Sequence, residues 1–534
     1  MGTLVGTGSL VRLALRRDRV RLPIWIVGLT VVPVITASAL ADLYPTVESR
    51  RQFGSILSSN PSLTALIGPV FDPSSIGGLT AWRVGGFIAV LVALMSLLTV
   101  VRHSRAEEEA GRLELLGATV VGRHAPLTAA LVVAFGANLV LAALVALGLA
   151  GLGEPAGSVA LGLSFAAVGW VFAALAAVTE QLTAHARTAT GLAGLILGVT
   201  FLLRVAGDAS GEDGPVWLSW LSPIGWAQRI RPFADERWWV LAFPAAFAVV
   251  LVAVAHLLVA HRDLDAGLIP TRSGPETAAP SLRSPLGLAW RLHRASLAWW
   301  TVAFAVVGVV LGGIADGMRA LATDNPQLRQ LIAAMGGEKG IIDSYFSSMM
   351  GVLGLVATIY GLQAALRPRA EEVGLRAEPL LATPTTRLRW LGGHVVFALV
   401  GVVVPLAAGG AAAGLVHGLR TGDAAEETPR VLAGALAQLP AVWVTVGIAV
   451  ALFGLLPRMV GVTWAALVLF LLVSQFGPML QLNQWLLDVS PFTHVPKLPG
   501  GEFAATPLAW LALVAVGLTA AGFAGFRRRD ITTE

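Results

Sequence analysis

The chain has 534 residues, of which 56% are hydrophobic and only 13% charged, and its mean hydropathy is +0.75. This composition is typical of membrane proteins and excludes a soluble enzyme, which would carry about twice that share of charged residues. Cysteine is absent, so disulfides, thiol catalysis and thiolate metal sites are excluded. The nine histidines show no metal-ligand spacing, and we expect no metal site.

Apolar stretches long enough to cross a bilayer recur along the whole chain. A spanning helix needs about 20 mostly apolar residues, whereas a barrel strand needs only about 10 of alternating polarity. The stretches therefore predict an all-α membrane protein. We expect no cleavable signal peptide, because no small-residue cleavage pattern follows the first stretch. We expect about twelve transmembrane helices, near residues 22–41, 84–101, 127–151, 158–179, 188–206, 238–260, 297–316, 346–366, 392–416, 431–456, 459–478 and 507–526.

Basic residues set the expected orientation. Arginines at 12–21 precede the first stretch, and the positive-inside rule places them in the cytoplasm. Twelve spans return the C-terminal arginines at 527–529 to the same side, which puts 24 of the 37 Lys and Arg residues there. The Arg- and Ala-rich composition fits a bacterial gene. We therefore expect a multi-pass protein of the bacterial plasma (inner) membrane with both termini in the cytoplasm.

An internal repeat divides the chain into two halves. Residues 105–123 and 369–387 align without a gap at an offset of 264, and ten of the nineteen positions are identical. A second echo, at offset 268, joins Trp217 and Ser222-Pro223 to Trp485 and Ser490-Pro491. We interpret the Trp-rich segments as an interfacial belt or a re-entrant hairpin. The repeat predicts two six-helix halves of the same orientation, related by a pseudo-two-fold axis along the membrane normal.

The predicted domains follow from this repeat. Residues 1–261 form a first six-helix half with an N-terminal amphipathic helix, residues 262–285 a Pro-rich cytoplasmic linker, and residues 286–534 the second half. Ser284-Pro285 predicts a helix start, and the helix after it, with Arg291 and Arg294, resembles a second amphipathic helix at the inner interface.

The repeated segment predicts a charged cytoplasmic loop after the second helix of each half. On a helix, residues seven apart share a face, as we expect for Glu107 with Glu114 and for Glu371 with Glu378. Residues four apart can form ion pairs, as we expect for Glu108–Arg112 and Glu372–Arg376. Gly111 and Gly374 predict a break in each loop. A solvated turn is the alternative interpretation, but the repetition of a charged, partly apolar element favours docking of a two-fold soluble partner. The docking residues that we predict are Glu107, Glu108, Arg112, Glu114, Glu371, Glu372, Arg376 and Glu378.

Each copy begins with Arg-x-Glu-Glu and ends with a form of Glu-Leu-Leu-x-Ala-Thr-Pro-x-x-Arg. This pattern resembles the segment after the second helix of ABC-2 type permeases, the membrane subunits of one class of ABC exporter. The duplicated twelve-helix form resembles the actinobacterial polyketide-antibiotic (tetronasin-type) exporters. This resemblance implies that each loop is a coupling helix and that the driving ATPase is a separate protein. The first copy departs from the pattern with Val120 in place of Pro, and the second with Pro379 in place of Leu.

The chain itself has no phosphate-binding loop. Such a loop needs Gly-x-x-x-x-Gly-Lys-Ser/Thr, and Lys339 and Lys497 follow Glu338 and Pro496 instead. We therefore expect no catalytic residues and no cofactor here, with ATP and Mg bound by two copies of a soluble ABC ATPase. The alternatives are an ion-coupled secondary transporter of hydrophobic compounds, which would hold carboxylates near the midplane, and a membrane-embedded enzyme.

Spans nearly free of charge favour a hydrophobic or amphipathic cargo, antibiotic-like or lipid-like. Several large apolar side chains are candidates for the substrate pathway, with ordinary helix packing or lipid contact as the alternative. They are Phe87, Met95, Phe346, Met349, Met350, Phe470 and Phe476.

Overall fold

The computed structural model describes residues 3–58, 64, 67–113, 120–209, 216–263, 266–269, 276–324, 337–476 and 483–531. Helices and turns account for these residues, and none of them lies in a strand. The chain folds as two compact units, Met1–Gly274 and Pro275–Glu534. The boundary between the units lies within residues 262–285.

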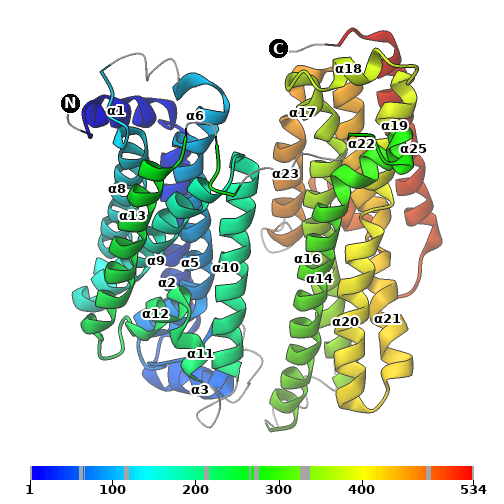
Figure 1. The fold of residues 1–534 in the computed structure, drawn as a ribbon. Coiled ribbons are helices and arrows are strands. Elements are labelled where there is room, and N and C mark those ends of the chain that lie inside the picture. The colour runs from blue at the N-terminus through cyan, green and yellow to red at the C-terminus, as the bar shows by residue number, and fades with distance from the viewer. Residues whose placement is uncertain are drawn as a thin grey trace. The chain divides into compact units, whose positions relative to one another are not determined.

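Unit 1 is a helical bundle around α9, against which α5, α8, α10 and α13 pack. In this unit α1 and α6 lie at one end of the bundle and α3 and α11 at the other (Figure 1). Its elements are α1 (Thr7–Arg17), α2 (Arg21–Leu43), α3 (Val47–Ser58), α5 (Ile76–His103), α6 (Arg105–Glu109), α8 (Ala125–Gly148), η1 (Ala150–Leu152), α9 (Pro155–Leu182), α10 (Ala186–Ala209), α11 (Trp217–Trp220), α12 (Pro223–Arg229), η2 (Trp238–Leu241) and α13 (Ala242–His261).

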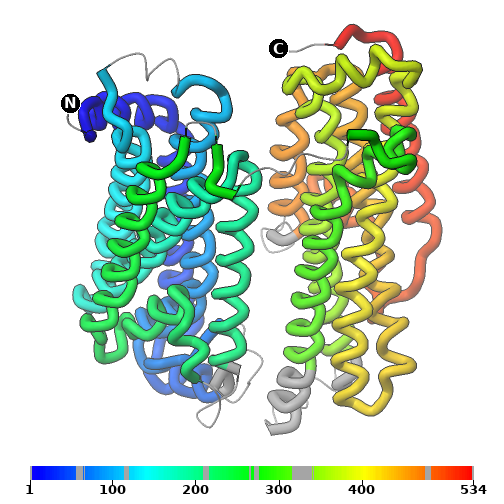
Figure 2. Tube along the Cα trace, in the orientation of Figure 1, coloured from blue at the N-terminus to red at the C-terminus, as the bar shows by residue number. Residues whose placement is uncertain are grey.

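Unit 2 packs α22 against α25 and α14 against α20, and α17 and α18 lie at the end where the chain terminates; Figure 2 traces the same path as a tube. Its elements are η3 (Pro280–Arg283), α14 (Pro285–Asp324), α16 (Gly337–Ala365), α17 (Arg367–Val373), α18 (Ala377–Leu381), α19 (Arg387–Leu399), α20 (Val403–Thr421), α21 (Ala424–Leu436), α22 (Leu439–Leu455), η4 (Pro457–Met459), α23 (Val462–Phe476), α24 (Gln484–Leu487), η5 (Pro491–His494) and α25 (Ala505–Arg528).

Among the described residues, eleven helical stretches are long and apolar enough to cross a membrane, six in unit 1 and five in unit 2. The remaining expected span, near 459–478, corresponds to α23, which is shorter. The eleven stretches are Arg21–Leu43, Ile76–Glu109, Ala125–Leu152, Pro155–Leu182, Ala186–Asp208, Trp238–His261, Pro285–Ala315, Ile342–Val373, Arg387–Thr421, Ala424–Leu455 and Ala505–Arg528.

Helix ends and close helix contacts follow from local sequence. Ser284 accepts a hydrogen bond from the Gly287 N–H (3.0 Å), and Pro285 opens α14, so the predicted helix start is confirmed. Small residues let helices approach closely. In unit 2 a Cβ on Gly454 of α22 would lie 2.0 Å from the Gly522 carbonyl oxygen of α25, so only glycine fits this contact.

The N-terminal amphipathic helix is present as α1, but its counterpart in the second half is not a separate helix. Arg291 and Arg294 lie in the first turns of α14, which runs from Pro285 to Asp324 as one helix of 40 residues. Between Gly287 and the apolar run no further Gly or Pro interrupts the segment, so the helix propagates into the span.

Candidate functional site

We call residues 104–123 the first charged loop and residues 366–387 the second charged loop. The first follows α5 and begins with the short helix α6, and the second follows α16 and contains α17 and α18. The left-handed backbone of Gly111 (φ 69°) ends the helical turn of the first loop. In the second loop the left-handed residue is Leu375 (φ 58°), which aligns with Gly111 at offset 264.

The breaks predicted at Gly111 and Gly374 are both confirmed, since Gly374 follows the end of α17 at Val373 and α18 begins only at Ala377. In the second loop, however, the left-handed residue is the one after the glycine. Gly374 has φ −81°, and Leu375 takes the left-handed conformation despite its Cβ. The left-handed residue occupies the same aligned position in both loops because the same backbone hydrogen bond forms in each. The Gly111 N–H donates to the Glu108 carbonyl (2.9 Å), and the Leu375 N–H donates to the Glu372 carbonyl (3.0 Å).

The ion pairs differ from those that helical spacing predicts. We expected Glu108–Arg112 and Glu372–Arg376, but Arg112 pairs with Glu107 (Nε to Oε2, 2.7 Å) and Arg376 with Glu371 (Nε to Oε2, 2.9 Å). The left-handed residue between the partners turns the chain and brings groups five apart together. The hydrogen bonds and charge of Glu107 raise the pKa of the Arg112 guanidinium.

A second expectation also fails in the second loop. Glu371 and Glu378 do not share a face of one helix, because Glu371 lies buried in α17 and Glu378 lies exposed in α18. Pro379 occupies the first turn of α18, where its missing N–H is tolerated. Glu114, the partner proposed for Glu107, lies outside the described residues.

In the first loop, Glu108 lies between two arginines, and Arg105, Glu108 and Arg262 form what we call the first triad. Arg105 Nη1 is 2.9 Å from Glu108 Oε2. Arg262, which directly follows α13, donates from Nη1 to Oε1 (2.6 Å) and from Nη2 to Oε2 (2.7 Å). The Glu108 side chain is only 4% exposed, so this carboxylate faces its own chain.

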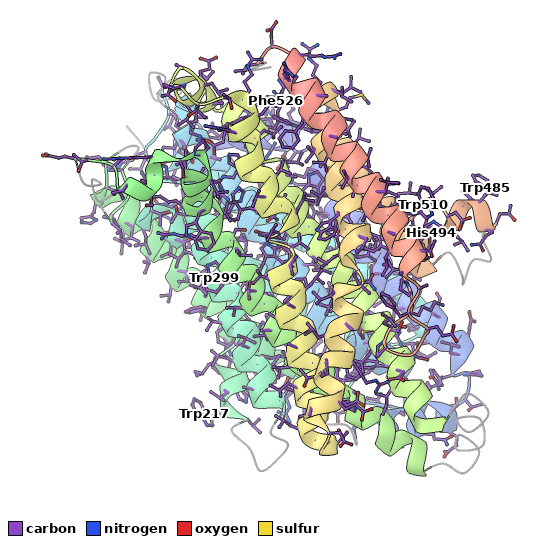
Figure 3. The ribbon with its side chains drawn as sticks, turned by 90° about the vertical axis from the view of Figure 1, so that its right-hand side faces the viewer. Trp217, Trp299, Trp485, His494, Trp510 and Phe526 are labelled. Carbon is purple, nitrogen blue, oxygen red and sulfur yellow. The ribbon has the colours of Figure 1, made fainter. Side chains whose placement is uncertain are left out.

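The second loop repeats this arrangement, and Arg369, Glu372 and Arg529 form the second triad. Arg369 Nη1 is 3.4 Å from Glu372 Oε2. Arg529, which directly follows α25, donates from Nη2 to both carboxylate oxygens at 2.8 and 3.0 Å. Its guanidinium also lies 4.8 Å from the ring centroid of Phe453 and 5.0 Å from that of Phe526. Figure 3 labels Phe526 near this end of α25 and Trp510 toward the other.

Sequence reasoning missed Arg262 and Arg529, because they lie 154 and 157 residues from their carboxylate partners. One signal for them exists in the sequence. Each is a basic residue at the end of the last apolar stretch of its half.

The residues that are exposed in the two loops differ from the eight residues that we predicted to dock a partner. The side chains of Arg112 and Arg376 are 51% and 65% exposed. Val373 and Leu375 are also more than half exposed, beside the exposed Glu378. A partner would therefore meet guanidinium groups, apolar side chains and Glu378, while Glu107, Glu108, Glu371 and Glu372 are held inside their units.

Most of the candidate pathway residues lie inside the units. Met95 belongs to the core of unit 1, and Phe346, Met350 and Phe470 belong to the core of unit 2, with Met349 packed against them. Phe87 lies on the surface at 62% exposure, and the side chain of Phe476 lies outside the described set.

At the end of unit 1 opposite α1, a buried polar cluster joins α10 to the short helices. Arg204 pairs with Asp208 (3.0 Å) and donates to Gln228 Oε1 (3.0 Å), and Ser219 donates to Asp208 (2.8 Å). Beside this cluster lies a cavity of about 30 Å³, lined by Trp82, Phe71 and Gln228 among others. The exposed Trp217 and Trp485 stand at the ends of short helices in their own units (Figure 3).

Comparison with known proteins shows the family of the chain. The family model described as "Multidrug efflux system permease Rv1217c, C-terminal domain" matches residues 8–260 and 282–527. Over 529 residues, the chain is 43% identical to the multidrug efflux system permease protein Rv1217c of Mycobacterium tuberculosis, and the alignment covers 98% of this chain and 95% of that protein. The chain therefore belongs to this family of multidrug efflux permeases of the cell membrane.

Proposed function

We propose that the chain is the permease subunit of an ATP-driven ABC exporter of the ABC-2 type, driven by a separate ATPase that docks at the two charged loops. The observation that carries this proposal is the duplicated loop. Both copies share a left-handed residue at the same position, the same Arg–Glu pair across it, and an exposed guanidinium. Two matching loops suit a pair of identical ATPase subunits.

The exposed residues of the second loop have the character of an interface. We call Val373, Leu375, Arg376 and Glu378 the docking face. Exposed apolar side chains beside charged groups are typical of a surface that another protein covers. In the first loop, the exposed Arg112 holds the place that corresponds to Arg376.

A twelfth crossing, and with it the parallel arrangement of two six-helix halves, rests on a direction argument in unit 2. The Glu372–Arg529 pair places the end of α25 beside the end of the Ile342–Val373 span, so the two run in the same direction. Ala424–Leu455 runs in that direction as well, since one span lies between it and Ile342–Val373. These directions support a further crossing between Leu455 and Ala505.

The helix available for that crossing is α23. Its 15 residues reach about 22 Å at 1.5 Å per residue, short of the roughly 30 Å hydrocarbon core. Because the directions of the neighbouring spans support a crossing here, we nevertheless propose the stretch that contains α23 as the twelfth span. Both termini then lie on the same side, which the distribution of arginines identifies as the cytoplasm.

The cargo that we propose is a hydrophobic or amphipathic drug-like compound. The name of the Mycobacterium tuberculosis relative describes multidrug efflux. The charged groups within the spans support an apolar path, because they lie near helix ends. Glu180 is two residues from the end of α9 and accepts hydrogen bonds from Ser104 and Gln181, and Asp208 is next to the end of α10.

Purification of the tagged chain with and without an ABC ATPase tests this proposal. We expect no ATP hydrolysis from the isolated chain, and stoichiometric co-purification of an ATPase from native membranes, with hydrolysis in the complex. Nucleotide turnover by the isolated polypeptide, or native complexes that contain no ATPase, would contradict the proposal.

A further inference from the structure

The two triads join distant parts of each unit in the same way. Glu108 and Arg262 belong to the loop after the second span and to the end of the last span of unit 1, and Glu372 and Arg529 occupy the same places in unit 2. The offsets are 264 for the glutamates and 267 for the arginines. The same contact therefore occurs twice in one chain, between elements that correspond in the repeat.

A second contact closes on the same arginines from the other end of each loop. Arg123 Nη2 donates to the backbone carbonyl of Arg262 (2.5 Å), and Arg387 Nη1 donates to that of Arg529 (2.7 Å). Arg123 and Arg387 are the last aligned positions of the repeat. Each loop thus holds the residue after the last helix at two points: its side chain through a glutamate and its carbonyl through an arginine. We call these paired contacts the loop–helix clamps.

The surroundings of the two clamps differ, although the contacts agree. In unit 1 Arg262 Nε donates to Gln181 Oε1 of α9 (2.6 Å), whereas in unit 2 Arg529 lies over aromatic rings. Agreement of the contact despite different surroundings indicates that the link itself, rather than the local packing, is the common feature.

The glutamate contact of each clamp is buried and geometrically specific. The Glu372 side chain is 0% exposed, and both Arg262 and Arg529 reach two carboxylate oxygens, which fixes orientation as well as distance. A buried ion pair of this kind contributes more to a defined geometry than to net stability. A displacement of the loop must therefore move the end of the last helix or break a buried pair.

We propose that Arg262 and Arg529 are positioning residues that make the last helix of each unit follow its charged loop when a docked ATPase changes state. This inference rests on the proposed function. It adds a route by which a movement at the docking face reaches a helix that crosses the membrane. The last helix, rather than the second span alone, then responds to ATP.

A single cysteine in this cysteine-free chain reports on that helix. Thr506, exposed near the start of α25, lies far from the clamp at the opposite end of the helix. The reporter Thr506→Cys is combined with Arg529→Gln, with the conservative Arg529→Lys, or with the control Arg528→Gln, whose side chain is exposed at the same helix end. The rate of labelling by a thiol reagent is measured in the complex with its ATPase, with and without ATP.

We expect ATP to change the labelling rate in the parent and in Arg528→Gln, the change to be lost in Arg529→Gln, and part of it to return in Arg529→Lys, while ATPase co-purification stays normal. If Arg529→Gln does not accumulate, the double variant Glu372→Gln, Arg529→Gln replaces it, because it leaves no buried carboxylate without its partner. An ATP response in these variants equal to that of the parent would overturn the inference, as would a parent reporter that ignores ATP within an intact complex. Absence of any ATPase from the complex would instead overturn the proposed function.

Discussion

At the residue scale, the aligned positions 111 and 375 show how a repeat preserves backbone conformation while it changes the residue. Glycine adopts the left-handed region freely, whereas a side chain such as leucine costs about 1–2 kcal/mol there. Leu375 is nevertheless held in place, because its N–H donates to the Glu372 carbonyl and Glu371 pairs with Arg376. The sequence predicted a break in each loop, but not that a leucine would adopt the left-handed conformation in the second.

This conformation leads to a prediction about Gly111. A Cβ at Gly111 would meet no atom within 4 Å, so Gly111→Ala costs only the backbone term, about 1 kcal/mol of destabilisation. Gly8 in α1 is equally open but helical, and there Gly8→Ala stabilises by up to about 1 kcal/mol. Thermal unfolding in detergent should therefore move in opposite directions for the two variants. A shift of the same sign in both would show that Gly111 is not held in the left-handed region.

At the element scale, each charged loop combines a part fixed within its unit with a part exposed to a partner. The repeat allowed the loops, their charged residues and the α1 helix to be predicted from sequence, because alignment and periodicity are local signals. Local spacing gave the wrong partners, since it assumes one continuous helix through Gly111 and Leu375. The pairing of Arg262 and Arg529 with the glutamates was missed, because contacts across 154 and 157 residues leave no periodic pattern in the sequence.

The docking face gives the prediction that belongs to this scale. Glu378 is exposed, so reversing it by Glu378→Arg should change stability by about 0–1 kcal/mol and leave abundance in the membrane normal. Within a partly desolvated interface, loss of a charge pair costs about 2–5 kcal/mol, enough to release the ATPase and stop efflux. The double reversal Glu114→Arg, Glu378→Arg should release it more completely.

Asp423, exposed where α21 begins, supplies a matched reversal away from the loop. Asp423→Arg should leave both ATPase co-purification and efflux of a hydrophobic dye unchanged. Normal efflux by the double reversal would identify the loops as solvated turns.

At the scale of the whole molecule, composition and the length of the apolar stretches predicted a helical membrane protein, and the structure has eleven helices of spanning length within its described residues. The count of crossings was harder to predict, because an apolar run in sequence does not say whether its helix continues to full length. The apolar run 459–478, for example, predicts a full span, whereas the helix within it, α23, covers only Val462–Phe476.

Cysteine labelling in intact cells decides this count. With twelve spans, Ser55→Cys and Thr506→Cys lie outside and react with an impermeant thiol reagent, whereas Ser281→Cys and Thr383→Cys are protected. All four side chains are exposed in the structure, so protection reports the membrane rather than burial. Labelling at Ser55 with protection at Thr506 would show that the α23 stretch does not cross.

The direct test of the central claim, that a separate ATPase drives this permease, is transport in inverted membrane vesicles. We predict that a hydrophobic fluorescent dye accumulates only when ATP, Mg and the partner ATPase are present, and that a protonophore leaves this accumulation unchanged. Accumulation driven by a proton gradient without ATP would contradict the claim and identify an ion-coupled carrier instead.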